Sequence, residues 1–578
     1  MNEQDLLFFN GINGSTGDYL LPPMTPEQVS RIAQGEEFDP DQLQDIELKI
    51  REKQEPDFAP IEGVDPKDLA QTGWGVVFPG GDSSEIKEIR EALSELLNHR
   101  KKQATQKHEH YYKEYIGVKG YRPGESKKNF LARQGVGPGP ADPDKMPYYL
   151  LIVGDPVTIP YAFQSQLSVQ YAVGRIHFDT LQEYAQYAHS VVEAETSNLS
   201  LSPSAAFFGV CNPGDAATNL STEHLIQPLS EWVVKEHPNW DVKTILKEEA
   251  TKARLGQLLG GSETPSLLFT ASHGMGFDKG DTRQLLHQGA LLCQDWPGPG
   301  RPGAKPMRED FYFSGDDIGE QARLLGMIAF FFACYGAGCP QYDEFDGHKK
   351  ASRPEIAPRS FLARLPQKLL SHPKGGALAV VGHIDRAWGC SFSWSDIKGS
   401  TRDAIQTAIE RRQIAVFQSS VKRLLEGHPV GSALEYFDER YAEISSDLNI
   451  ELEEIKFGAE PNHASLAGMW TANNDARNYA IIGDPAVRLV VSSSKDASTT
   501  RPTMEPVQLP AGLEPKPAES SADSVAGEID LKQAQTQLIT SLEQFVNTAP
   551  KTPVDSAETL QTATSIAINL LNVLKGLS

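Results

Sequence analysis

Ser266-Leu-Leu-Phe-Thr-Ala-Ser-His273-Gly274 is a short apolar run that ends in a histidine and a glycine. The run Met327-Ile-Ala-Phe-Phe-Phe-Ala-Cys334-Tyr-Gly336 repeats this pattern with a cysteine in place of the histidine. Short β-prone runs broken by glycine are typical of buried strands that end in turns. In a parallel sheet, residues just past the carboxyl ends of the strands meet in one crevice. The pattern therefore predicts that His273 and Cys334 lie together at one end of a sheet.

A histidine and a cysteine in one crevice form a reactive pair. The thiolate is a nucleophile, and an imidazole can activate it or protonate the leaving group. Gly274, Ala333 and Gly336 surround the pair, and such small residues let a substrate backbone approach closely. Taken singly, a cysteine or histidine after an apolar run is usually a structural side chain, so the inference rests on the combination. His383 also follows a strand and is the competing histidine.

Apolar strands alternate with helices over much of the chain, which predicts an α/β fold with a mostly parallel sheet covered on both faces. The predicted strands are Tyr148–Val153, Ala205–Val210, Asp241–Leu246, Ser266–Ala271, Met327–Ala333, Ala377–Val381 and Tyr479–Ile482. The predicted helices between them are Leu181–Glu195, His224–Lys235, Lys252–Leu259, Ser360–Leu370 and Thr401–Leu425. A further strand at Gly73–Phe78 and a helix at Ser83–Gln103 precede them.

Composition and charge exclude several classes of protein. The chain has 578 residues and a formal net charge of −23, which argues against sequence-blind binding to nucleic acid. We expect no membrane span, because no apolar run is long enough. The N-terminus lacks the basic and apolar regions of a signal peptide, and five cysteines without paired spacing favour neither a disulfide framework nor a structural zinc site. These features predict a cytoplasmic enzyme.

Three further segments extend the pattern around the two motifs. Tyr149-Leu-Leu-Ile-Val-Gly154-Asp155-Pro156 and Tyr171-Ala-Val-Gly174-Arg175 precede the histidine motif, and Tyr479-Ala-Ile-Ile-Gly483-Asp484-Pro485 follows the cysteine motif. In this order, the set resembles the gingipain type of cysteine peptidase, in the clan that also holds caspases, legumain and separase. The resemblance covers residues 148–491. It implies caspase-like, mostly parallel sheets flanked by helices, built as two side-by-side α/β subdomains.

The resemblance also implies a mechanism. Cys334 would attack the scissile carbonyl to form an acyl-enzyme, and His273 would protonate the leaving amine and then activate water. The backbone N–H groups of Gly274 and Cys334 would form the oxyanion hole. No third catalytic residue is evident: Asp155 either orients the imidazole or caps a turn, and the turn is the preferred interpretation.

For the substrate pocket, the resemblance implies a preference for a basic residue. The segment around Trp388 and Phe392 is similar to the family's pocket wall. The family's acidic residue has no counterpart at its usual place, so Asp385 is the candidate that would read the substrate cation. If Asp385 does not have this role, a neutral or acidic residue is the alternative, with Arg386 as the selector for an acidic one.

No cofactor is required for this chemistry, and no metal site is predicted among the site residues. Calcium, which gingipains bind, is a candidate ligand of the acidic loop Asp343, Glu344 and Asp346. A solvated loop is the preferred interpretation, because the loop lacks a calcium-binding spacing such as that of an EF-hand.

The expected organisation is an N-terminal arm (1–60), an α/β extension (61–147), two catalytic subdomains (148–200 and 201–491), a flexible linker (492–527) and a helical pair (528–578). The helical pair is expected to pack on the catalytic unit or on a regulatory partner chain. The resulting hypothesis is a regulated cysteine endopeptidase that acts on protein or peptide substrates. The alternatives are a catalytically silent scaffold that recruits partners, and a caspase-like peptidase with an acidic preference in defence or cell death.

Overall fold

The computed structural model describes residues 6–35, 63–343 apart from 138, 198, 304 and 306, 353–392, 402–492, 501–509 apart from 503, and 513. For residues 390 and 402–413 only the backbone is described. The predicted helical pair, most of the linker, much of the N-terminal arm and acidic-loop residues Glu344 and Asp346 lie outside these ranges. The domain boundaries stay a prediction.

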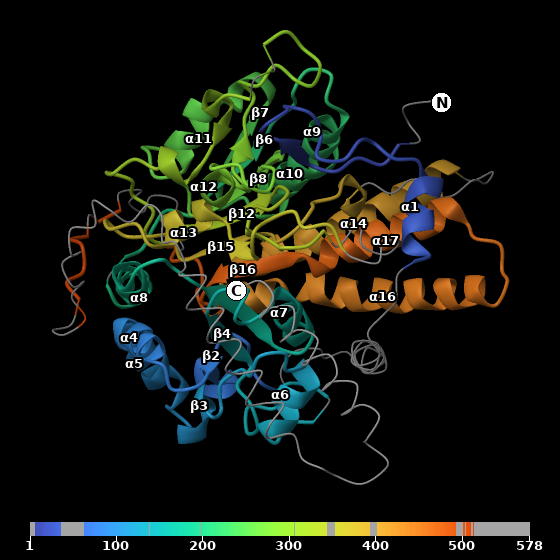
Figure 1. Ribbon diagram of the computed structural model, residues 1–578. Helices are drawn as coiled ribbons and strands as arrows, with labels where there is room; N and C mark the ends of the chain where they lie inside the picture. The colour runs from blue at the N-terminus through green and yellow to red at the C-terminus, as the bar shows by residue number, and fades with distance from the viewer. Residues whose placement is uncertain are drawn as a thin grey trace, which may run out of the picture. The chain divides into compact units, whose positions relative to one another are not determined.

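A ten-stranded sheet forms the centre of the fold (Figure 1). Its eight inner strands are mostly buried, which explains why their sequences are largely continuous apolar runs, whereas the edge strands β3 and β7 are more exposed and more polar. From one edge to the other they are β3 (Tyr112–Gly117), β2 (Trp74–Gly80), β4 (Tyr149–Val153), β5 (Ala172–Ile176), β16 (Tyr479–Gly483), β15 (Ala379–His383), β12 (Ile328–Phe332), β8 (Leu267–Ala271), β6 (Ser204–Gly209) and β7 (Asp241–Leu246).

The sheet consists of two parallel groups that run in opposite directions. β3, β2, β4, β5 and β16 are parallel to one another, and so are β15, β12, β8, β6 and β7. The groups meet at the antiparallel pair of β16 and β15. Their carboxyl ends therefore lie at opposite edges of the sheet, so residues that follow strands of different groups do not share a crevice.

Helices cover both faces of the sheet, as Figure 1 shows. One face carries α4 (Ser84–Ala92), α5 (Ser94–Ala104), α8 (Leu181–Thr196) and α13 (Arg364–Leu370). The other carries α7 (Tyr161–Ser168), α10 (Gln227–Glu236), α14 (Arg402–Leu425), α15 (Val430–Ala433) and α16 (Glu435–Lys456), with α17 (His463–Arg477) on α16. The shorter α3 (Leu69–Thr72), α6 (Lys127–Arg133), α9 (Ala216–Ser221), α11 (Lys252–Leu258) and α12 (Gln284–His287) lie in the connections.

Two small sheets lie beside the main one. β13 (Gly338–Cys339) pairs with β14 (Phe361–Leu362). The other sheet has the order β1 (Gly11–Asn13), β9 (Gly274–Gly276), β10 (Leu291–Leu292) and β11 (Tyr312–Phe313). Through β1, the N-terminal segment joins the part of the chain that follows His273. α1 (Pro26–Ala33) then packs on α17.

The predicted α/β fold is confirmed, and each predicted strand lies within one or two residues of an observed one. The prediction of one helix over Ser360–Leu370 is wrong in its first part: residues 361–362 form β14, and the helix begins at Arg364. The predicted helix Ser83–Gln103 is two helices that meet at Leu93. In the described part of the chain, no helix is long and apolar enough to cross a membrane.

Candidate active site

His273 and Cys334 follow neighbouring parallel strands at the same distance from their ends. In the register of β8 and β12, Ala271 lies opposite Phe332, and each reactive residue comes two positions later. Both strands belong to the same parallel group, so the sheet brings the two motifs to one edge as the sequence pattern predicts. The side chains of both residues are fully buried, with no exposed surface.

Gly274 lets the two motifs approach each other closely. A Cβ atom built on Gly274 would lie 1.7 Å from the carbonyl oxygen of Cys334, so no larger residue fits without a backbone shift. The backbone N–H groups of Gly274 and Cys334 donate to the same atom, the carbonyl oxygen of Asn10, with N···O distances of 3.0 and 3.2 Å. Two backbone donors that converge on one carbonyl oxygen have the geometry of an oxyanion hole.

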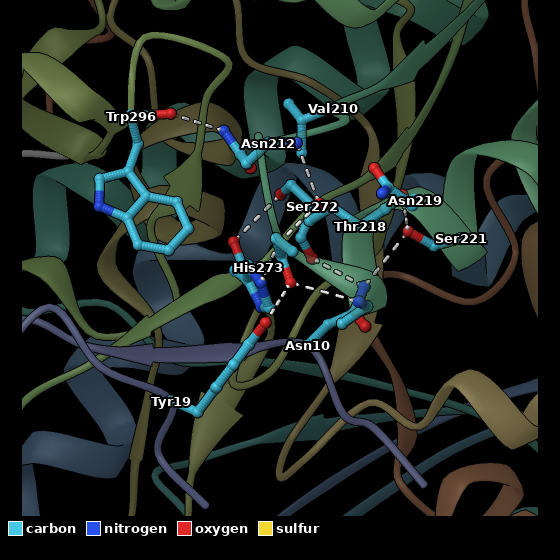
Figure 2. Close-up of polar contacts among 12 residues, drawn as sticks. Asn10, Tyr19, Val210, Asn212, Thr218, Asn219, Ser221, Ser272, His273 and Trp296 are labelled. Carbon is cyan, nitrogen blue, oxygen red and sulfur yellow. Dashed lines mark hydrogen bonds and ion pairs between the residues drawn. The ribbon is translucent and has the colours of Figure 1, made fainter. Parts of the chain in front are cut away.

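The carboxylate that contacts the His273 imidazole is Asp215, which is not among the site residues predicted from the sequence. Asp215 caps the first turn of α9, and its Oδ2 lies 2.6 Å from His273 Nε2. Asp215 also accepts hydrogen bonds from Thr218 Oγ1 and Tyr19 Oη, and in Figure 2 the side chains of Tyr19 and His273 point toward one another. Its only sequence signal is the Asn212-Pro-Gly-Asp215 turn, which is common to many helix starts.

These contacts fix the ionisation of Asp215 and leave one imidazole nitrogen available. Burial alone would raise the pKa of Asp215, but the charge and hydrogen bond of His273, with the hydroxyl donors, outweigh it and hold that pKa below its ordinary value. His273 Nδ1 is buried and has no hydrogen-bond partner among the described residues. The imidazole is thus held through Nε2, and Nδ1 is the atom that can exchange a proton with a substrate.

Asp155, the carboxylate considered for this role from the sequence, lies elsewhere. It follows β4, which belongs to the oppositely directed group of strands, and its Oδ1 accepts a hydrogen bond from Thr158 N at 2.6 Å. That contact is a turn cap. The reversal of direction between the two groups explains why a residue at a strand end of the first group is far from the crevice of the second.

The Cys334 thiol is held by the segment that follows β15. Ala387 N donates to Cys334 Sγ at 3.2 Å, and burial raises the pKa of the thiol well above its ordinary value. The next residue, Tyr335, has a φ of 59°, a left-handed conformation that is uncommon for a residue with a side chain. Strained turns of this kind are found at sites where a side chain must be presented in one direction.

The residues predicted to form the substrate pocket also follow β15 and reach the same edge. Trp388 is 2% exposed, and its ring lies 5.5 Å from that of Phe9. Phe392 packs against Phe332 under the strand ends. Trp388 therefore contacts the N-terminal segment directly, whereas Phe392 lies in the core.

Asp385 and Arg386 are buried next to each other and are already engaged. The Arg386 guanidinium donates two hydrogen bonds of 2.9 Å to Asp343, and its Nη1 lies 3.5 Å from Asp385 Oδ1. Asp343, one of the three candidate calcium ligands, is thus bound to an arginine. Among the described residues there is no group of three or more His, Cys, Asp or Glu side chains suited to a metal ion.

The competing histidine, His383, has a different environment. It is the last residue of β15, is fully buried, and its Nε2 lies 3.0 Å from Asp475 Oδ1. The same carboxylate oxygen accepts a hydrogen bond from Trp388 N at 2.9 Å. The His383 ring packs against Tyr479 with a centroid distance of 4.1 Å. These contacts join β15 to α17, and they are those of a core histidine.

The family model described as peptidase family C25 matches residues 83–490. The structure of the Arg-specific cysteine proteinase gingipain R is 11% identical, with a TM-score of 0.41 over 76% of this chain and 81% of that one. The complex of the pro- and mature domains of RgpB from Porphyromonas gingivalis is also 11% identical, with a TM-score of 0.39 over 74% of this chain and 81% of that one.

A third solved structure, described as a protease, is 13% identical, with a TM-score of 0.40 over 73% of this chain and 80% of that one. No curated protein matches the chain.

Proposed function

Because the chain belongs to peptidase family C25, and is therefore a cysteine-type peptidase, we propose that Cys334 is its nucleophile and His273 its general acid and base. The substrate is a protein or peptide. The observation that carries the proposal is the convergence of Gly274 N–H and Cys334 N–H on one carbonyl oxygen beside the thiol.

The reaction proceeds through an acyl-enzyme. Cys334 Sγ attacks the scissile carbonyl carbon while the two backbone N–H groups stabilise the negative charge on its oxygen, an effect of roughly 3 kcal/mol per donor. His273 Nδ1 protonates the leaving amine as the C–N bond breaks, and then takes a proton from the water that hydrolyses the thioester. Asp215 is a positioning residue, which holds the imidazole through Nε2.

We infer that the site is closed to added substrates as it stands. Both reactive side chains have no exposed surface, so an added substrate cannot reach them. Activation therefore requires the cover over the site to move. A partner chain that binds the C-terminal helices is the regulator that the sequence predicts. That partner and the cytoplasmic location stay predictions.

For the residue on the amino side of the cut, the sequence predicts arginine or lysine, with Asp385 as its ionic partner. The pairing with Arg386 weakens the case for this residue, since a substrate cation would have to compete with a guanidinium 3.5 Å away. Asp385→Asn tests the prediction: cleavage after basic residues should fall about a hundredfold if Asp385 is the selector. Preferential cleavage after acidic residues would instead implicate Arg386.

Substitution of the two catalytic residues tests the proposed function. Cys334→Ala should abolish cleavage of a proteome-derived peptide library, read by mass spectrometry, and labelling by peptide acyloxymethyl ketones. Cys293→Ala, at another fully buried thiol, should leave both unchanged. His273→Ala should slow cleavage about a thousandfold, as expected for loss of acid–base assistance.

If His383→Ala abolished cleavage and His273→Ala did not, the role of general acid and base would pass to His383. A protein that neither cleaves peptides nor reacts at Cys334 would be the silent scaffold. Calcium is tested in the same assay: unchanged activity after chelation would exclude a catalytic requirement for it.

A further inference from the structure

Residues 7–13, here called the cleft segment, cross the active site as an extra strand. Before Gly11 the segment pairs antiparallel with the chain after β15: Asn10 N donates to Ala387 O at 3.0 Å, and Gly389 N donates to Phe8 O at 3.2 Å. From Gly11 onward it forms β1, which is parallel to β9. Addition of a strand to an exposed edge is a common way for a protein to bind an extended peptide.

The peptide bond between Asn10 and Gly11 occupies the reactive position. Its carbonyl oxygen is the atom that accepts both oxyanion-hole hydrogen bonds. A Cβ atom built on Gly11 would lie 3.2 Å from Cys334 Sγ and 2.6 Å from a methyl group of Leu20, so the thiol lies beside this bond and only glycine fits there without a shift.

The Asn10 side chain fills a closed, neutral pocket. It is fully buried, and its Nδ2 donates to Ser272 O at 3.3 Å and to Ser221 Oγ at 3.5 Å, as Figure 2 shows. Its Oδ1 is buried without a hydrogen-bond partner among the described residues. Both partners of the Asn10 amide are uncharged, and the carboxylate of Asp215 is already engaged by Tyr19, Thr218 and His273. The pocket therefore suits a short carboxamide better than a long cation.

Residues on both sides of Asn10 also contact the active site. The Phe9 ring packs on Trp388, so the tryptophan contacts the residue before the carboxamide and not the carboxamide itself. Farther along, Tyr19 donates to Asp215 and its ring lies 5.8 Å from that of His273. The cleft segment and Tyr19 thus lie against Trp388, His273 and Asp215, and the segment presents one peptide bond to Cys334.

We propose that the cleft segment is an intramolecular substrate, that the enzyme cuts its own chain between Asn10 and Gly11, and that the pocket selects asparagine on the amino side of the cut. This proposal rests on the proposed function. Cys334 Sγ forms a bond to the Asn10 carbonyl carbon, and the C–N bond to Gly11 breaks as His273 gives a proton to the Gly11 nitrogen. Water then hydrolyses the thioester, which releases a peptide with Asn10 as its terminal carboxylate and restores the thiol.

The test is intact-mass and N-terminal analysis of the full chain after incubation. The wild type should yield a chain that begins at Gly11, and Cys334→Ala should remain uncut. The Asn13-Gly14 bond is an internal control, because it is the same dipeptide outside the oxyanion hole and should stay intact. Asn10→Leu, which keeps the size but removes the amide donor, and Asn10→Arg should each slow the cut about a hundredfold.

A substitution at Asn10 can displace the cleft segment and so slow the cut for a reason other than selectivity. The preference for asparagine over arginine is therefore also measured on added peptides. The peptide with the sequence of residues 6–15 should be cleaved after its first asparagine, and its counterpart with arginine at that place about a hundredfold more slowly. Peptide cleavage with an intact Asn10–Gly11 bond, or equal cleavage after arginine, would overturn this proposal but leave the proposed function standing. Absence of all cleavage and of Cys334 labelling would overturn both.

Discussion

At the scale of single residues, the two carboxylates considered for His273 differ in what the fold does with them. Asp215 and Asp155 each begin a turn after an apolar run, and each accepts a hydrogen bond from a backbone N–H nearby. Only Asp215 also reaches the imidazole, since its strand belongs to the same parallel group as β8. Which of the two carboxylates reaches His273 therefore depends on strand direction and not on the local sequence of either turn.

Asp215→Asn should lower kcat about a hundredfold or more and leave KM nearly unchanged, because the imidazole loses the carboxylate that fixes its orientation and stabilises its charged form. Steady-state kinetics on a peptide substrate provide the measurement. The matched control is Asp155→Asn, which keeps a capping oxygen in a turn outside the site and should leave kcat unchanged. Equal losses in the two variants would mean that Asp215 acts only through stability.

At the scale of elements, a buried arginine ties together parts of the first strand group. Arg100 on α5 donates from Nε to Asp484, just past β16, and from both Nη atoms to Glu195 on α8. Arg100 is 1% exposed and Asp484 is fully buried, and Trp74 Nε1 donates to the other Asp484 oxygen. The Gly483-Asp484-Pro485 motif is therefore a structural anchor for two helices.

Arg100→Ala should lower the free energy of unfolding by roughly 3–5 kcal/mol, because it removes the cation from the fully buried Asp484 and from the partly buried Glu195. Urea denaturation followed by circular dichroism measures this change. Asp82→Ala, which breaks a pair with Lys87 that is largely exposed, should produce no measurable change. A small effect of Arg100→Ala would show that water or another group compensates for the lost cation.

At the scale of the whole molecule, two five-stranded parallel groups make one sheet, and the reactive edge belongs to one of them. The segment that covers this edge, residues 7–13, comes from the N-terminal part of the chain. The amide of Asn10 contacts Ser272 across 262 positions of sequence. The cover over the crevice is thus a property of the assembled fold, because the same N-terminal segment completes a small sheet through β1 and contacts the active-site edge.

Stability should fall as the solution is acidified below about pH 4. The pKa of Glu195 is lowered: burial would raise it, but the charges and hydrogen bonds of Arg100 and His99 outweigh burial, and the pKa of Asp215 is lowered as well. The unfolded chain binds these protons at a higher pH than the folded one, so the stabilisation is present above about pH 5 and is lost as pH falls toward the folded pKa values.

Urea unfolding at a series of pH values from 7 to 3 measures this dependence. Glu195→Gln should reduce the loss of stability between pH 5 and pH 3 relative to the wild type. An equally steep loss in the variant would assign the acid sensitivity to other carboxylates.

The prediction of secondary structure worked where local pattern carries the information. The apolar runs that end at His273-Gly274 and Ala333-Cys334 form adjacent parallel strands, as expected. The prediction failed at residues 361–362, which lie in a helical sequence pattern. These two residues form β14 instead, because they pair with Gly338 and Cys339. Such pairing joins distant segments and leaves no periodic signal in either of them.

Short apolar runs and the residues that end them were enough to predict the α/β class, the order of the strands along the chain, and the meeting of His273 and Cys334 at one edge of the sheet. Only the folded chain shows that the two strand groups run in opposite directions, that Asp215 and not Asp155 meets the imidazole, and that the Asn10 carbonyl oxygen accepts hydrogen bonds from Gly274 N and Cys334 N. The physical reason is that hydrophobic periodicity is a local property. Which strand ends and which distant segment share one crevice depends on backbone hydrogen bonds between residues hundreds of positions apart.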